Sequence, residues 1–326
     1  MTISASAAGP LVASGPAGAP ALRVSGLRKR YADVVAVDGL DLTVRAGECF
    51  GLLGPNGAGK TTTIEICEGL TAPDEGIVEV LGRRWSDDEH ALRERLGIQL
   101  QETQLADKLT VEETVRMFRS FYRKGRPVDE AIALVQLDEK RAARVGKLSG
   151  GQKQRLALAC AIVGEPDLIF LDEPTTGLDP QSRRQLWDLI TEFKSLGRTI
   201  ILTTHYMDEA EILCDRVAIV DHGKVIALGT PLELIGSLGA EHVIEFAVES
   251  ATTPIEVDAL RQLEGVRSAR ALAVGYELQV SALHLTVPAL LALVAQHGGT
   301  LTQLTTHSAS LEDVFVSLTG RQLRDE

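Results

Sequence analysis

The chain has 326 residues, which is enough for two domains of average size. It is 44% hydrophobic and 24% charged, a composition typical of globular domains. The net charge of −12 argues against a general affinity for nucleic acid, which needs a basic surface, so we expect no nucleic-acid partner.

The N-terminal segment, residues 1–20, consists mainly of Ala, Gly, Pro and Ser and is expected to form a disordered tail. It has neither the basic start nor the unbroken apolar stretch of a signal peptide. No segment reaches the roughly 18 apolar residues of a membrane helix, so any transport role requires a partner. The cysteines are expected to be buried free thiols rather than a zinc or disulfide framework: Cys49, Cys67, Cys160 and Cys214.

Strands and helices alternate through the first two thirds of the chain, which predicts an α/β fold with a largely parallel sheet. The expected strands are 21–31, 34–44, 48–53, 77–81, 167–171, 199–203, 217–220 and 224–228. The expected helical segments are 60–70, 111–145, 152–163, 181–196 and 207–213.

A second unit is predicted to begin near Gly239, with the order strand 243–248, helix 255–263, two strands divided by Gly275, helix 287–297 and strand 301–305. This β-α-β-β-α-β order is that of a ferredoxin-like α+β module. A last helix follows Ser310, and its apolar residues Leu311, Val314, Phe315 and Leu318 share one face that we expect to be docked. We assign 21–238 to the first domain and 239–326 to a C-terminal regulatory or assembly domain.

A glycine-rich loop joins the expected strand 48–53 to the helix that follows it. It fits the phosphate-binding pattern G-x-x-x-x-G-K-[ST] over Gly54, Pro55, Asn56, Gly57, Ala58, Gly59, Lys60 and Thr61, with Thr62 next. Glycines let backbone N–H groups turn toward phosphate oxygens, and the helix start adds its positive end. Lys60 is placed to reach the β- and γ-phosphates, and Thr61 to offer its hydroxyl to Mg²⁺.

A second motif is the apolar strand 168–171, which ends in the carboxylates Asp172 and Glu173. Asp172 is placed to hold Mg²⁺, and Glu173 to accept a proton from an attacking water. An acidic pair before Pro174 also fits the start of a turn, but the phosphate loop upstream favours the catalytic interpretation.

The third motif is Leu148-Ser149-Gly150-Gly151-Gln152, which continues as Lys-Gln-Arg155. Ser149 suits a helix cap, and the two glycines leave room for an anion at the helix start. The five residues alone also fit an ordinary capped helix.

Taken together and in this order, the motifs resemble the nucleotide-binding domain of ABC ATPases over about residues 22–235. The resemblance implies a P-loop NTPase fold of ABC type with a helical subdomain at about 101–148. It also implies ATP and Mg²⁺ as cofactors. In that family the Ser-Gly-Gly motif of one subunit closes over ATP held by another, which implies a homodimer and makes Ser149, Gly150, Gly151 and Gln152 nucleotide-contacting residues.

The same resemblance implies roles for four further residues. Tyr31 matches the aromatic that stacks on adenine, although packing at a strand end also explains it. Gln101 matches the glutamine that contacts Mg²⁺, with Gln99 as the alternative two residues away. His205 matches the histidine that contacts the γ-phosphate and acts in catalysis with Glu173 and Lys60. Asp179 matches the loop at the dimer interface.

The C-terminal sequence from Leu311 to Gly320 is similar to the ending of daunorubicin/doxorubicin-resistance ATPases, and Gly177-Leu-Asp after Thr176 fits the same branch. This implies multidrug efflux and antibiotic resistance, with export of a drug, lipid or other hydrophobic cargo. The chain would act with a separate membrane permease at the cytoplasmic face of the cell membrane.

Two other hypotheses remain open. The first is a soluble ABC ATPase in translation or DNA repair, although this chain has one set of motifs and no long coiled-coil insertion. The second is a degenerate regulatory subunit, against which the intact Lys60, Ser149 and Glu173 argue.

Overall fold

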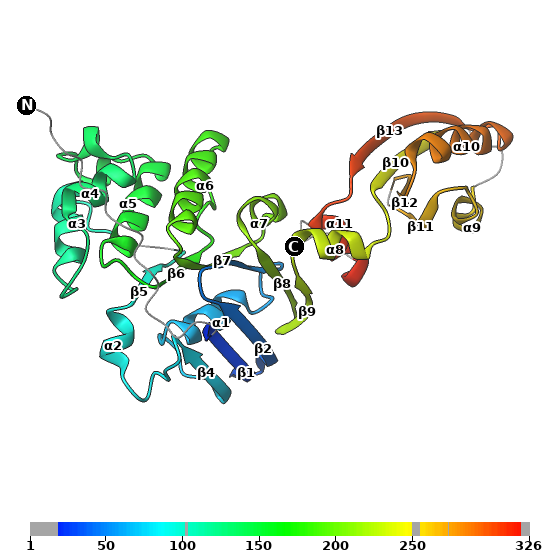
Figure 1. Cartoon of the computed structure of the whole chain (residues 1–326). Coiled ribbons are helices and arrows are strands. Elements are labelled where there is room, and N and C mark those ends of the chain that lie inside the picture. Colours follow the sequence, from blue (N-terminus) through cyan, green and yellow to red (C-terminus); the bar gives the residue numbers. More distant parts are fainter. Residues whose placement is uncertain (1–18, 102–103, 250–254, 273, 321–326) are drawn as a thin grey trace, which may run out of the picture. The chain divides into compact units, whose positions relative to one another are not determined.

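The computed structural model describes residues 19–101, 104–249, 255–272 and 274–320. The chain divides into two compact units, residues 1–228 and 229–325 (Figure 1). The division follows Leu228 rather than Leu238, because helix α8 (Pro231–Ser237) contacts helix α11 (Leu311–Thr319) of the second unit. The disordered tail was expected over residues 1–20, and residues 1–18 of it lie outside the described residues.

A six-stranded sheet forms the centre of the first unit, with the order β5-β6-β7-β3-β8-β9. Its strands are β5 (Leu96–Gln99), β6 (Leu168–Asp172), β7 (Thr199–Thr204), β3 (Cys49–Leu53), β8 (Arg216–Asp221) and β9 (Lys224–Gly229). The pairs from β5 through β8 are parallel. Strands β3, β6 and β7 are buried along their whole length, which explains their nearly continuous apolar sequences. Parallel pairing places the carboxyl ends of β3, β6 and β7 side by side.

A three-stranded antiparallel sheet, β2-β1-β4, adjoins this layer. Its strands are β1 (Pro20–Tyr31), β2 (Val34–Arg45) and β4 (Glu75–Val80). Their apolar side chains share one hydrophobic core with helix α1 (Lys60–Cys67) and with β3. Helix α1 ends at Cys67, three residues before the expected end at Leu70. Gly69 follows with a left-handed backbone conformation, φ of 74°, which is common just after a helix end.

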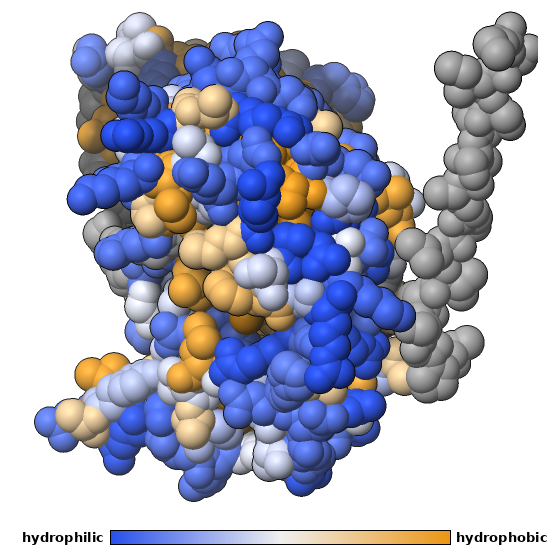
Figure 2. All heavy atoms as spheres, turned by 90° about the vertical axis from the view of Figure 1, so that its left-hand side faces the viewer, coloured by the Kyte–Doolittle hydropathy of each residue, from blue (hydrophilic) through white to orange (hydrophobic). Residues whose placement is uncertain are grey.

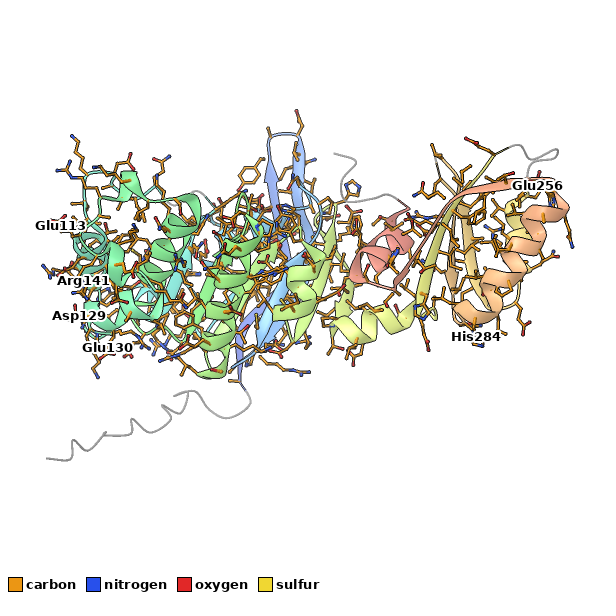
Figure 3. The ribbon with its side chains drawn as sticks, turned by 90° about the horizontal axis from the view of Figure 1, so that it is seen from above. Glu113, Asp129, Glu130, Arg141, Glu256 and His284 are labelled. Carbon is orange, nitrogen blue, oxygen red and sulfur yellow. The ribbon has the colours of Figure 1, made fainter. Side chains whose placement is uncertain are left out.

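The segment expected to be helical from 111 to 145 is divided into short elements, which corrects that prediction. It forms α3 (Val111–Arg119), α4 (Val128–Leu134), η1 (Asp138–Lys140) and η2 (Val145–Lys147). Gly125, with φ of 157°, and Pro127 separate α3 from α4 because neither suits a helix interior. An ion pair between Arg141 and Asp129, with N–O distance 2.6 Å, links the short elements (Figure 3).

Four further helices complete the first unit: α2 (Glu89–Arg93), α5 (Gly150–Ile162), α6 (Pro180–Ser195) and α7 (Met207–Leu213). Helices α3, α4 and α5 contact one another and form a helical layer beside β5. Figure 2 shows apolar side chains between hydrophilic ones on the side of the molecule that carries α3 and α4. Exposed apolar residues of this region include Leu100, Met117 and Phe121.

The second unit has a four-stranded antiparallel sheet with the order β11-β12-β10-β13. After α8, its elements are β10 (His242–Glu249), α9 (Val257–Arg261), β11 (Val266–Ala271), β12 (Tyr276–Val280), α10 (Leu283–Gln296), β13 (Thr300–Ser308) and α11. This is the β-α-β-β-α-β order expected from the sequence. On α11, Leu311, Val314 and Phe315 are buried as expected, whereas Leu318 is 50% exposed and does not belong to the docked face.

Candidate functional site

The loop between β3 and α1 has the backbone conformation that a phosphate cradle needs. Gly57 and Gly59 adopt φ values of 77° and 97°. A Cβ at Gly59 would lie 2.2 Å from the Ala36 carbonyl oxygen, so only glycine fits there. Among the hydrogen bonds of the described residues, none uses the N–H groups of Asn56, Gly57 or Gly59 as donors. These donors remain available for an anion.

Lys60 begins α1 and is almost fully buried, with 4% of its surface exposed. Its ammonium donates hydrogen bonds to the carbonyl oxygens of Gly54 at 2.8 Å and Pro55 at 3.0 Å. Burial lowers the pKa of this ammonium, while the nearby carboxylates of Glu173 and Asp172 oppose that effect. The Lys60 ammonium therefore lies inside the curve of the loop. Phosphate oxygens could there replace the carbonyl oxygens of Gly54 and Pro55 as its partners.

The carboxylates Asp172 and Glu173 lie at the carboxyl end of β6, beside this loop. Burial raises the pKa of Asp172, and the hydroxyls of Thr203 and Thr61 and the charge of Lys60 oppose this by favouring the ionised form. The Thr203 hydroxyl donates a hydrogen bond to Asp172 Oδ1. A buried carboxylate flanked by Thr61 is the donor set that Mg²⁺ uses together with phosphate oxygens.

Three of the other predicted residues, Lys60, Gln101 and His205, converge on Glu173. Its Oε2 accepts a hydrogen bond from Gln101 Nε2 at 3.3 Å, and His205 Nδ1 lies 3.3 Å from the same oxygen. Its Oε1 lies 3.7 Å from Lys60 Nζ. The His205 imidazole, followed by the charge of Lys60, lowers the pKa of Glu173 despite its burial. The carboxylate is therefore ionised at neutral pH and able to accept a proton.

The backbone at Glu173 is strained, with φ of 45° in a non-glycine residue. Thr203 of β7 supports this conformation, because its carbonyl oxygen and its hydroxyl both accept hydrogen bonds from the Glu173 N–H, at 3.2 and 2.9 Å. Thr176 adds a hydrogen bond of 3.1 Å to Glu173 Oε2. Neither threonine was among the predicted site residues, because each lies within a strand or turn whose sequence has no chemical signature.

The two candidate glutamines lie in different surroundings. Gln99 is buried in β5, and its Nε2 donates a hydrogen bond to Gln154 of α5 at 2.7 Å. Gln101 follows the strand and contacts Glu173. The geometry therefore favours Gln101 over Gln99 as the residue at the site.

Ser149 caps helix α5, as expected. Its hydroxyl accepts a hydrogen bond from the Gln152 N–H at 3.3 Å, and the Gln152 side chain accepts one from the Ser149 N–H at 3.0 Å. Ser149 and Gly150 are exposed. No hydrogen bond or ion pair among the described residues joins 149–152 to the phosphate loop. One copy of the chain therefore does not bring these two anion-binding segments together.

Tyr31 and Asp179 also lie apart from the carboxylate pair. The Tyr31 ring, 45% exposed, lies at the tip of the β1–β2 hairpin, with Lys29 Nζ 5.4 Å from its centroid. Asp179 caps helix α6 and accepts hydrogen bonds from the N–H groups of Gln181 and Ser182, both at 3.0 Å. The contact with Ser182 is the main reason that the pKa of Asp179 is lowered.

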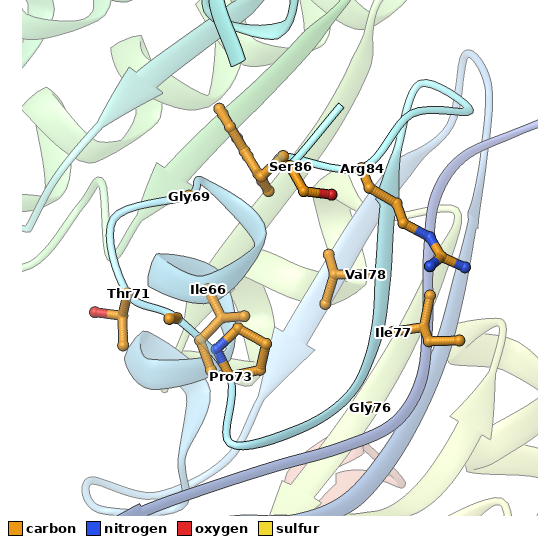
Figure 4. Close-up of a pocket in the computed structure, with 11 residues that line it drawn as sticks. Ile66, Gly69, Thr71, Pro73, Gly76, Ile77, Val78, Arg84 and Ser86 are labelled. Carbon is orange, nitrogen blue, oxygen red and sulfur yellow. The ribbon is translucent and has the colours of Figure 1, made fainter. Parts of the chain in front are cut away.

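A cavity of about 400 Å³ lies at the other end of α1 (Figure 4). Ile66, Ile77, Val78 and Trp85 supply apolar walls, and Arg84 lies among its lining residues. None of the predicted site residues lines this cavity.

No helix among the described residues combines the length and the apolar character that a membrane span requires. No group of three or more His, Cys, Asp or Glu side chains there is arranged to hold a metal ion. Among the residues expected to hold Mg²⁺, only Asp172 carries a carboxylate, while Thr61 offers a hydroxyl and Gln101 an amide oxygen.

Comparison with known proteins relates the whole chain to one group. It is 39% identical over 315 residues to the Nod factor export ATP-binding protein I of Ralstonia nicotianae, covering 94% of this chain and 96% of that protein. It is 38% identical over 310 residues to the protein of the same name from Sinorhizobium fredii, covering 94% and 88%.

Solved structures resemble about two thirds of the chain. An ATP-binding subunit of an ABC transporter is 31% identical, with a TM-score of 0.61, over 67% of this chain and 93% of that one. A dimeric bacterial ABC transporter cassette is 25% identical, with a TM-score of 0.59, over 64% and 98%. The family described as ABC transporter matches residues 37–176, which contain the phosphate loop, Ser149 and both carboxylates. The chain therefore belongs to the ABC transporter family, as an ATP-binding subunit.

Proposed function

We propose that this chain hydrolyses ATP as a homodimer and so powers export through a separate membrane subunit. The observation that carries the proposal is the convergence of Lys60, Gln101 and His205 on the Glu173 carboxylate, directly beside the phosphate loop. An ionised carboxylate so placed can accept a proton from a water that attacks the γ-phosphate.

The residues at this site fit ATP and Mg²⁺. The free N–H groups of the loop and the Lys60 ammonium would bind phosphate oxygens, with the ammonium leaving its two carbonyl contacts. Thr61, Asp172 and Gln101 would hold Mg²⁺, which when bound neutralises charge on the transferring phosphoryl group. His205 would bind the γ-phosphate while Glu173 takes the proton, and the Tyr31 ring would stack on adenine.

A second copy of the chain would complete the site. Ser149, Gly150, Gly151 and Gln152 form an exposed helix start that their own phosphate loop does not use. A helix N-terminus with glycines is suited to an anion, so we assign this segment to ATP held by the other copy. Asp179, at the start of α6, would lie at the interface. The similar dimeric cassette supports this arrangement.

Similarity to named export proteins supports the proposal of export. The relatives at 38–40% identity are named Nod factor export ATP-binding proteins. We assign the chain to the cytoplasmic face of the cell membrane, with a permease contacting the helical segment. The ending Leu311–Gly320 resembles the daunorubicin/doxorubicin-resistance type, so we extend the proposal to a drug, lipid or other hydrophobic cargo.

The substitution Glu173→Gln tests this function. We expect it to leave ATP binding intact and to slow hydrolysis by about 10²–10⁴-fold, the usual effect of losing a general base. An ATP-bound dimer should accumulate, because the closed state no longer decays through hydrolysis. Steady-state turnover and gel filtration with ATP and Mg²⁺ measure both effects, and Glu130→Gln, an exposed carboxylate on α4, is the matched control. Unchanged turnover in Glu173→Gln would contradict the assignment of Glu173 as the general base.

A further inference from the structure

Strand β13 forms one edge of the sheet in the second unit and leaves one side of its backbone unpaired among the described residues. It has nine residues, Thr-Leu-Thr-Gln-Leu-Thr-Thr-His-Ser, and eight of them are exposed. Such an edge presents a row of free N–H and C=O groups that can pair with another strand. Proteins usually protect these edges with charges, proline, short strands or β-bulges. The segment Thr300–Ser308 has no acidic residue, lysine, arginine or proline, and its one irregularity is a register shift at Thr302, between the pairs Ala247–Gln303 and Val248–Leu301.

The opposite edge of the same sheet is protected. Strand β11 has six residues, and two of them are arginines, Arg267 and Arg270. Arg270 is paired with Glu277 of the neighbouring strand at 2.8 Å. The two edges of one small sheet thus differ in the features that prevent edge-to-edge association.

The register of β13 shows which backbone groups face outward. Ala309 N–H donates to the Glu241 carbonyl at 3.0 Å, so the backbone of Ala309 faces β10. In an antiparallel pair the residues alternate, so His307 and Thr305 also face β10, opposite Val243 and Glu245. The groups of Leu304, Thr306 and Ser308 therefore face away from the sheet and are the ones a new strand would meet.

The strand is compatible with its own copy. An antiparallel pairing about Leu304, the central residue, places Leu304 beside its copy and Thr302 beside Thr306 of the second chain. Leu304 is 38% exposed and lies opposite Phe246 of the core, so its copy would cover apolar surface. Threonine pairs are favourable across strands, and no like charges meet, although the chain as a whole carries −12.

We propose that β13 pairs with β13 of a second copy of this chain, antiparallel and about a two-fold axis at Leu304, joining the two four-stranded sheets into one. The proposal rests on the homodimer proposed above. A single strand pair is weak between free molecules. Once ATP joins the first units of two copies, the pairing becomes intramolecular and is favoured by the high effective concentration. It would then hold the two copies together when the nucleotide sites open.

Disulfide trapping tests the pairing and its register. The four native cysteines are buried, so an exposed engineered thiol reacts selectively. Leu304→Cys places the two thiols on directly opposite residues, within disulfide reach. Thr302→Cys places them four residues out of step, about 13 Å apart along the strand, which is too far. Ala271→Cys, exposed on the β11 edge, is the matched control. We expect Leu304→Cys to cross-link at least tenfold faster than either of the other variants in the full chain.

A proline substitution tests the same pairing without a thiol. Thr306→Pro removes an outward N–H and leaves the hydrogen bonds to β10 in place. By symmetry, two interchain hydrogen bonds are lost, so we expect the dissociation constant of the dimer to rise about tenfold relative to that of the Ala271→Pro control. Sedimentation measures this, and circular dichroism checks that both variants are folded.

The outcomes separate this proposal from the proposed function. If Leu304→Cys cross-links no faster than Ala271→Cys, the pairing is wrong, whatever Glu173→Gln does. If Leu304→Cys cross-links rapidly while Glu173→Gln forms no ATP-dependent dimer, the pairing stands and the ATP-bound dimer fails. Rapid cross-linking of Thr302→Cys alone would overturn the register about Leu304.

Discussion

At the scale of single residues, Glu68 is a buried carboxyl group that has no role in the proposed nucleotide site. It follows α1 and is 1% exposed, and neither carboxylate oxygen has a hydrogen-bond partner among the described residues. Burial, followed by the charges of Asp172 and Glu65, raises its pKa to about 8 from an ordinary value of 4.5. The carboxyl group is therefore mainly neutral in the folded protein at pH 7.

This shift predicts a pH dependence of stability. Between pH 4.5 and about 8 the unfolded chain ionises Glu68 while the folded chain keeps it protonated, so the free energy of unfolding falls as pH rises. Glu68→Gln removes this loss. We expect the stability of the variant relative to the wild type to increase by a few kcal/mol from pH 4.5 to pH 8. Urea unfolding at both pH values measures it, with Glu130→Gln as control, and a difference that is independent of pH contradicts the prediction.

The residues of the site could be predicted to different extents. Lys60 and Glu173 belong to motifs whose local spacing carries the chemistry, and the structure brings them within 3.7 Å. The sequence could not decide whether Gln99 or Gln101 lies at the site. Their hydrogen-bond partners decide it, and these partners lie 55 and 72 residues away along the chain. Thr203 could not be found at all, since its role depends on β7 lying beside β6.

At the scale of elements, the start of α5 contains two adjacent glycines with different surroundings. A Cβ at Gly150 would meet only Leu178, at 4.0 Å. A Cβ at Gly151 would lie 2.5 Å from Ser182 Oγ and 2.7 Å from Ser182 Cβ, on helix α6. The second glycine is therefore required for the packing of α5 on α6, and the first is not.

This contrast predicts opposite effects for two alanine substitutions. Gly151→Ala should destabilise the first unit by about 1–3 kcal/mol, because α5 and α6 must separate. Gly150→Ala should be neutral or slightly stabilising, because alanine favours the helix. If Gly150 faces ATP on the second copy, Gly150→Ala should still lower ATP turnover at least tenfold. Thermal unfolding and turnover of both variants measure this, and a fully active Gly150→Ala would argue against the anion site at α5.

Element boundaries were predictable where periodicity and local signals agree. The capping box at Ser310 marks the start of α11, and the apolar runs of β3 and β6 mark buried strands. The division of 111–145 into short helices was missed, although Gly125 and Pro127 signal it, because the apolar spacing on both sides remains helical. Helix α10 begins at Leu283 rather than at the expected 287 and includes Pro288 in its interior, whereas proline is most common in the first turn of a helix.

At the scale of the whole molecule, the chain consists of two compact units. The predicted nucleotide-contacting residues all lie in residues 1–228, and the edge strand β13, which lacks acidic residues, lysine, arginine and proline, lies in the second unit. The two-unit organisation was predictable from the change in strand and helix order. The boundary was displaced because α8 resembles a terminal helix of the first unit, and its packing against α11 is invisible in the local sequence.

Two truncations test this division. A fragment ending at Gly229 keeps β9 complete, and a fragment ending at Leu238 also keeps α8 without α11. We expect both to bind ATP with Mg²⁺ within a few-fold of the full chain, because the predicted nucleotide-contacting residues precede Leu228. Both should form weaker dimers and support less export, because β13 is absent. Isothermal calorimetry, sedimentation and whole-cell efflux measure these properties.

The two fragments should nevertheless differ from each other. Leu234 of α8 is 8% exposed in the full chain, and α8 contacts α11. Removing α11 uncovers the apolar face of α8, so the fragment ending at Leu238 should bind an apolar dye more strongly and aggregate at lower concentration than the fragment ending at Gly229. The reverse order would place α8 in the first unit and restore the boundary at Leu238. Loss of ATP binding in both fragments would make the second unit part of the catalytic fold.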